Sequence, residues 1–65
     1  MSELIAFYLG LEWGEWDSQF EDNQTYMGCQ YNPGERLQRE IAAGHLSTAN
    51  LQDIFLEGYN TGVGA

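Results

Sequence analysis

The sequence contains very few basic residues. Its 65 residues include ten acidic side chains, two arginines and no lysine, so the formal net charge is -8 at pH 7. Nucleic acids and anionic membranes are bound mainly through Lys and Arg. We therefore exclude direct binding to nucleic acid or to a membrane surface. A negative field favours a basic partner, and a basic protein surface is the partner class that we expect.

Cysteine, histidine and long apolar runs are also scarce. Cys29 is the one cysteine, so an internal disulfide is excluded, and together with His45 it cannot supply the four ligands of a zinc site. The longest apolar stretch, residues 4–9, is well below the roughly 20 residues of a membrane span. A signal peptide has basic residues before its apolar stretch, whereas this sequence has the acidic Glu3 there, so we expect no signal peptide. We expect a cytoplasmic protein with no metal and no cofactor.

The N-terminal half alternates between large apolar and small or polar residues. Ile5, Phe7, Leu9, Leu11 and Trp13 occupy alternate positions, and this period of two predicts a strand over residues 4–13. On a helical wheel the apolar residues of this stretch are spread all round, which disfavours an amphipathic helix. The alternative that stays open is a helix over the same residues, with Ser2 as its cap and Glu3 in its first turn.

A loop and a second strand are predicted to follow. Gly14 can end the first strand, and residues 14–24 are rich in turn-forming residues. Residues 25–31 resume the alternation and predict a second short strand.

Two helices are predicted in the C-terminal half. Asn32 is a cap candidate followed by Pro33 at the first helical position, and Gly44 is a C-terminal stop, so the first helix should cover residues 33–43. Ser47 should cap a second helix that ends at Gly58 or Gly62, with a frayed tail over residues 61–65.

Charge pairs are expected on the first of these helices. Glu35 and Arg39, and likewise Arg36 and Glu40, are four residues apart and can form two pairs along one helix. His45 should lie in the interhelix turn near the negative end of this helix.

A chain of this length forms one domain, residues 1–65. The prediction is an α+β fold, in which an N-terminal two-stranded antiparallel unit packs on a C-terminal αα-hairpin. A small all-α three-helix domain is the alternative. Two strands make a weak sheet, so a homodimer that continues the sheet stays open. The predicted core is Ile5, Phe7, Leu9, Leu11, Met27, Leu37, Ile41, Leu51, Ile54 and Phe55.

The most unusual segment interleaves acids with aromatics. Residues 12–22 hold five of the ten acids together with two tryptophans and a phenylalanine. On a strand, carboxylates on one face would lie roughly 6.6 Å apart, which is of the order of the phosphate spacing along one DNA strand. The alternative is that the aromatics are core and the acids solvate a loop. The predicted partner-binding residues are Glu12, Glu15, Trp16, Asp17, Phe20, Glu21 and Asp22.

Catalysis is not expected. Nothing in the sequence brings Cys29 and His45 together as a nucleophile–base pair, and no orienting motif accompanies them. Residues 39–47 resemble the turn of helix–turn–helix repressors, yet Asp53 and Glu57 on the following helix would repel phosphates. A plain αα-hairpin is therefore the preferred interpretation.

The sequence thus predicts a non-catalytic acidic binding protein. Its sharper form is an inhibitor that occupies a basic, nucleic-acid-binding surface of a partner protein. In charge and size the chain is similar to phage and mobile-element counter-defence proteins, a resemblance of type without a shared motif. The alternative is a small structural or accessory subunit that docks on a larger complex through its aromatics.

Overall fold

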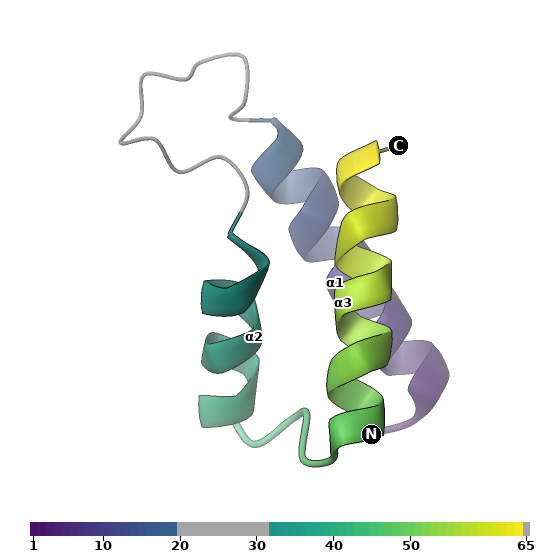
Figure 1. Cartoon of the computed structure of the whole chain (residues 1–65), viewed down its shortest axis with the longest axis vertical. Helices are drawn as coiled ribbons and strands as arrows, with labels where there is room; N and C mark the ends of the chain where they lie inside the picture. Colours follow the sequence, from purple (N-terminus) through teal and green to yellow (C-terminus); the bar gives the residue numbers. More distant parts are fainter. Residues whose placement is uncertain (20–31, 65) are drawn as a thin grey trace.

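Three helices make up the part of the chain that the computed structural model describes, residues 1–19 and 32–64. They are α1 (Glu3–Ser18), α2 (Pro33–Ala42) and α3 (Ala49–Gly64). α1 and α3 lie side by side and run in the same direction, and α2 runs the opposite way beside them (Figure 1). The described residues thus form a three-helix arrangement whose main contact is α1 against α3.

The predicted α+β fold is wrong, and the three-helix alternative is right. Residues 4–13 belong to α1, which continues through Gly14 to Ser18, and the described residues contain no strand. The Ser2 hydroxyl caps α1 by accepting a hydrogen bond from the Ile5 amide at 3.2 Å. The predicted strand over 25–31 lies outside the described residues, and a dimer that continues a sheet loses its basis.

The buried face of α1 explains why the alternation was misleading. This face consists of Ala6, Gly10, Gly14 and Asp17, none of them a large apolar residue. A Cβ atom added at Gly10 would lie 2.0 Å from the carbonyl oxygen of Phe55, so the two helix backbones touch. Small residues of α1 therefore form its contact with α3. The large apolar side chains of α1 lie on the flanks and the outer side of the helix.

Two glycines of α3 complete the same contact. A Cβ atom added at Gly58 would lie 2.1 Å from the Phe7 carbonyl oxygen, and one at Gly62 would lie 2.3 Å from the Leu11 carbonyl oxygen. Each helix therefore carries a Gly-x-x-x-Gly pair at the contact, the spacing that permits close approach of two helices. The prediction that Gly58 or Gly62 ends the helix is wrong.

Both ends of α3 also differ from the prediction. The tail is helical through Gly64. The cap is Thr48 and not Ser47, because the Thr48 hydroxyl accepts a hydrogen bond from the Leu51 amide at 3.2 Å.

The prediction for α2 is confirmed. The Asn32 side chain accepts a hydrogen bond from the Glu35 amide at 3.1 Å, and Pro33 occupies the first helical position. Gly44 follows the helix with a φ of 88°, a left-handed conformation that glycine adopts at low cost. Local capping chemistry was sufficient to place this helix.

The core lies between α1, α3 and the connection before α3. Two predicted members, Leu51 and Phe55, are buried, whereas Ile5 is 55 % exposed and the assignment of Ile5 to the core is wrong. Leu9, Leu37, Ile41 and Ile54 are partly buried against the core, Phe7 and Leu11 are half-buried, and Met27 lies outside the described residues. Within residues 1–19 and 32–64, the buried apolar residues are Ala6, Leu46, Leu51, Phe55 and Tyr59.

None of the helices in residues 1–19 and 32–64 combines the length and the apolar character that a membrane crossing requires.

Candidate functional site

A buried carboxylate joins the three helices. Asp17, near the C-terminal end of α1, is 1 % exposed. The guanidinium of Arg36 donates two hydrogen bonds to it, from Nε at 3.1 Å and from an Nη atom at 2.8 Å. The Tyr59 hydroxyl donates a further hydrogen bond to Asp17 and accepts one from the Asn32 amide at 3.0 Å. One carboxylate thus links α1 to α2 and to α3.

This cluster shifts the pKa values of its members. Burial, and after it the hydrogen bond to Asp17, raises the pKa of the Tyr59 phenol well above its ordinary value. The hydrogen bonds to Asp17 raise the pKa of Arg36. At neutral pH the phenol is therefore a neutral donor and the guanidinium is a fixed cation.

A second polar cluster holds Trp13 against α2. The indole N–H of Trp13 donates a hydrogen bond to Glu40 at 2.9 Å, and the Arg36 guanidinium lies over the ring, 4.4 Å from its centroid. The other carboxylate oxygen of Glu40 lies 2.7 Å from His45 Nδ1. Burial raises the pKa of Glu40, but the hydrogen bonds with His45 and Trp13 outweigh burial, so the pKa is lowered.

The predicted charge pairs on α2 are half right. Glu35 and Arg39 lie 3.9 Å apart as an exposed pair. Arg36 instead binds Asp17 of α1, and Glu40 binds Trp13 and His45, so the predicted pairing of Arg36 with Glu40 is wrong. Tertiary partners replaced a local pair because the buried carboxylate of Asp17 requires a counter-charge. His45 lies just after the C-terminal end of α2, as predicted.

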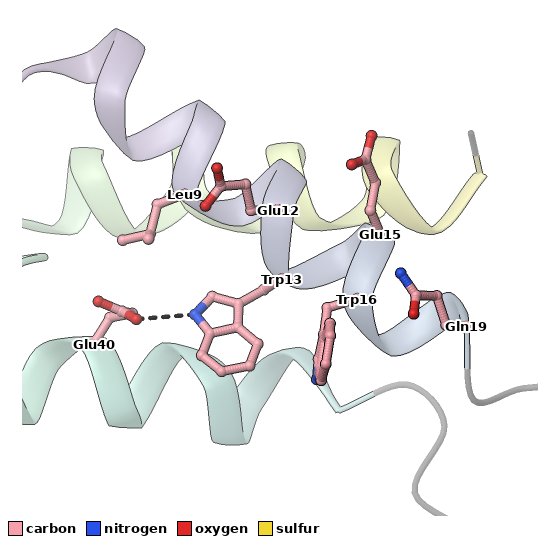
Figure 2. Close-up of a pocket in the computed structure, with 7 residues that line it drawn as sticks. All are labelled: Leu9, Glu12, Trp13, Glu15, Trp16, Gln19 and Glu40. Atoms are coloured by element: carbon pink, nitrogen blue, oxygen red, sulfur yellow. Dashed lines mark hydrogen bonds between the residues drawn. The ribbon is translucent and has the colours of Figure 1, made fainter.

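An open groove of about 640 Å³ lies between α1 and α2 beside this second cluster. Figure 2 shows the indoles of Trp13 and Trp16 projecting from α1 toward α2, with Glu15 pointing away from α2. We call this groove between α1 and α2 the acidic groove. It is lined by Leu9, Glu12, Trp13, Glu15, Trp16, Gln19 and Glu40.

The lining of the acidic groove suits a cation. Its seven residues include three acids and no base. Glu12 and Glu15 are exposed, and Trp16 is 51 % exposed. Carboxylates attract a guanidinium or ammonium group by charge, and an indole face attracts it through the ring quadrupole. The groove can therefore receive Arg or Lys side chains from a partner.

The structure brings together three of the predicted partner-binding residues, Glu12, Glu15 and Trp16, which line the acidic groove. Asp17 is buried and bound to Arg36 and Tyr59, so its carboxylate is not on the surface. Phe20, Glu21 and Asp22 lie outside the described residues. The acids of this segment that are described are helical, so the strand spacing of roughly 6.6 Å does not apply to them.

Sequence reasoning missed four of the lining residues. Leu9, Trp13 and Gln19 recur with Glu12 and Trp16 at helical spacings of three and four residues, so the helical alternative already grouped them. Glu40 comes from α2, and no local signal in the sequence places it opposite Trp13.

The surroundings of His45 and the distribution of possible metal ligands are known for the described residues. His45 contacts Glu40, and Cys29 lies outside the described residues. Over residues 1–19 and 32–64, no three His, Cys, Asp or Glu side chains are grouped so that they could hold a metal ion.

Comparison of the chain with protein-family models, with curated proteins and with solved structures gave no match.

Proposed function

We propose that the chain is a non-catalytic acidic binding protein that engages a basic surface of a partner protein through the acidic groove. One observation carries the proposal. Two exposed carboxylates, Glu12 and Glu15, and the half-exposed indole of Trp16 line one groove that contains no base.

The charge distribution supports a cationic partner. Arg36 pairs with Asp17 and Arg39 with Glu35, and both guanidinium groups lie near the Trp13 ring, 4.4 and 5.9 Å from its centroid. Among the described residues, neither arginine forms an ion pair with Glu12 or Glu15. The net charge of -8 extends the negative field beyond the groove. Such a field accelerates encounter with a basic surface and makes association sensitive to salt.

The hydrogen bonds behind the groove supply rigidity. Trp13 is held by Glu40 and stacked under Arg36, and Arg36 is itself held by Asp17. A wall fixed in this way loses little conformational freedom on binding, which leaves more of the interaction energy for affinity.

The sharper form of the proposal is that the partner is a nucleic-acid-binding protein of the cytoplasm, whose basic surface the chain blocks in the manner of a counter-defence inhibitor. The net charge and the basic-residue-free groove support this form. A regular row of carboxylates at phosphate spacing does not support it, because Glu12 and Glu15 lie on a helix.

The test compares two double variants with the same loss of charge. Glu12→Gln with Glu15→Gln removes the exposed carboxylates of the groove, and Asp53→Asn with Glu57→Gln removes two exposed carboxylates of α3. Tagged wild-type and variant chains are used to capture partners from cell lysate at low and high salt, with identification by mass spectrometry.

The expected result is a basic protein that the wild type and the α3 variant capture at low salt and that the groove variant loses. Competition by added DNA or RNA would support the nucleic-acid-binding form. Equal capture by both double variants would refute the acidic groove as the binding site.

A second candidate function, the accessory subunit, is favoured by a different observation. Leu4, Ile5 and Tyr8 are each more than half exposed on α1. A partner that stays bound to all variants at high salt would support this candidate, because apolar contacts are not screened by salt.

A further inference from the structure

The outer face of α1 carries an apolar half and an acidic half. Leu4, Ile5 and Tyr8 are 66 %, 55 % and 55 % exposed and recur at spacings of three and four residues. Glu12 and Glu15 continue the same face toward the C-terminal end of the helix and are exposed as well. We call these five residues, Leu4, Ile5, Tyr8, Glu12 and Glu15, the α1 outer face.

The exposed apolar half follows from the glycine contact. Because Gly10 and Gly14 bring the backbones of α1 and α3 together, the inward side of α1 has no room for large side chains there. Leu4, Ile5 and Tyr8 lie instead on the outward side of α1 and are each more than half exposed. Exposed apolar residues that share one helix face are typical of protein interaction sites.

The charge of this face selects among possible occupants. A second copy would bring another net charge of -8 against Glu12 and Glu15, and like charges across an interface oppose association. An anionic membrane is repelled for the same reason. A partner segment that is apolar at one end and basic at the other satisfies both halves.

We propose that the α1 outer face docks an amphipathic helix of the partner, with apolar side chains over Leu4 and Tyr8 and with Arg or Lys side chains over Glu12 and Glu15. Leu4 and Glu15 are eleven residue steps apart on the helix, or about 16 Å at 1.5 Å per step, which three helical turns of a partner would cover. Docking of apolar anchors at helical spacing is a recurrent mode of peptide recognition. The basic end of the partner helix rests on the proposed function. Its apolar end and its helical form go beyond that function.

The probe is a displayed library of helix-forming peptides of about 14 residues, or four turns, selected on the immobilised full chain. Selected peptides are then titrated against the wild type and three double variants. Leu4→Gln with Tyr8→Gln removes the apolar anchors, Glu12→Gln with Glu15→Gln removes the acids, and Asp53→Asn with Glu57→Gln is the charge-matched control. Leu4 and Tyr8 are exposed and Gln is a good helix former, so circular dichroism should show an unchanged fold.

The expected peptides carry apolar residues at spacings of three and four at one end and Arg or Lys at the other. Their affinity should fall about tenfold or more for the apolar variant and about threefold for the acid variant at low salt. The control variant should bind as the wild type does.

Several outcomes overturn the inference, and they are separable from failure of the proposed function. Peptides that are basic throughout and bind the Leu4 and Tyr8 variant normally would refute the docked helix and keep the acidic groove. Peptides whose affinity is unchanged by the Glu12 and Glu15 variant would refute the basic half of the docked helix, and the salt-dependent capture from lysate would still decide the proposed function. If no peptide is enriched, the docked helix is refuted, and the salt-dependent capture decides the function alone. Sedimentation that shows a wild-type dimer lost in the apolar variant would assign this face to a second copy.

Discussion

The guanidinium of Arg36 makes two hydrogen bonds to the carboxylate of Asp17, and only 1 % of Asp17 is accessible to solvent. The Arg36 guanidinium also lies over Trp13, a lining residue of the acidic groove. A single ion pair therefore connects the stability of the fold with the position of one wall of the groove.

Asp17→Asn should destabilise the chain strongly. Removal of one partner leaves the other charge without compensation, and breaking such a pair costs about 3 kcal/mol in the free energy of unfolding. Urea unfolding followed by circular dichroism measures the loss. Glu35→Gln is the control, because it breaks an exposed pair 3.9 Å long, for which a loss below about 0.5 kcal/mol is expected. Equal losses in the two variants would contradict a structural role for Asp17.

This result also governs how the binding experiment is designed. A triple neutralisation of Glu12, Glu15 and Asp17 would confound binding with unfolding, because Asp17 is buried and the two glutamates are exposed. The double variant at Glu12 and Glu15 separates the two effects.

Alanine at the helix–helix contact should destabilise the fold although alanine favours helix formation. A Cβ atom at Gly10 or Gly58 would lie 2.0 or 2.1 Å from a backbone oxygen, so α1 and α3 would have to separate. We expect each substitution to lower the free energy of unfolding by about 3 kcal/mol, at the upper end for overpacked cores.

The matched controls are Gly34→Ala and Gly64→Ala, where an added Cβ atom meets nothing within 4 Å. Helix propensity alone should make these variants neutral or up to about 1 kcal/mol more stable. Thermal unfolding of the four variants measures the contrast. Stabilisation at Gly10 or Gly58 would show that the backbones of α1 and α3 do not touch.

Alkaline pH should destabilise the fold through Tyr59. The pKa of its phenol is raised in the folded state, so above the ordinary value of about 10 the unfolded chain loses a proton that the folded chain keeps. Stability is then fully present below pH 10 and should fall by about 1.4 kcal/mol per pH unit above it. Urea unfolding between pH 8 and about 11.5 measures this slope.

Tyr59→Phe is the control for that slope. It removes the donor to Asp17 and the acceptor for the Asn32 amide, so it should be less stable at pH 8 by about 1–2 kcal/mol. Above pH 10 its decline should be shallower than that of the wild type, because all other titrating groups are shared. Parallel slopes would contradict the raised pKa of Tyr59.

A helix could be predicted from the sequence where the residues that fix it lie within or next to that helix. Asn32, Pro33 and Gly44 act within a few residues of their own helix, and they placed α2 to within one residue. α1 is held by a contact that only exists once α3 is present. Gly10 and Gly14 have no partner in their own segment, and without Gly58 and Gly62 they resemble helix breakers.

The candidate site was predictable in its exposed part. Glu12, Glu15 and Trp16 stood out by composition, and the structure places them on one groove. Asp17 belonged to the same composition but is buried by Arg36 and Tyr59, residues 19 and 42 positions away. No periodicity within the segment separates a buried carboxylate from its exposed neighbours, because the separation is made by partners distant in sequence.

The two tryptophans of the acidic groove should separate stability from binding. Trp13→Phe keeps an aromatic ring but removes the N–H donor to the buried Glu40, so it should cost about 1–2 kcal/mol of stability. Trp16→Ala truncates a side chain that is 51 % exposed, so it should cost less than about 1 kcal/mol of stability. The affinity of the Trp16→Ala variant for the captured partner should nevertheless fall tenfold or more, which is at least about 1.4 kcal/mol of binding energy. Urea unfolding and calorimetric titration on the same two variants measure both quantities. If Trp16→Ala lowers stability more than Trp13→Phe does and leaves affinity unchanged, Trp16 is a structural residue, and the partner does not use the aromatic wall of the groove.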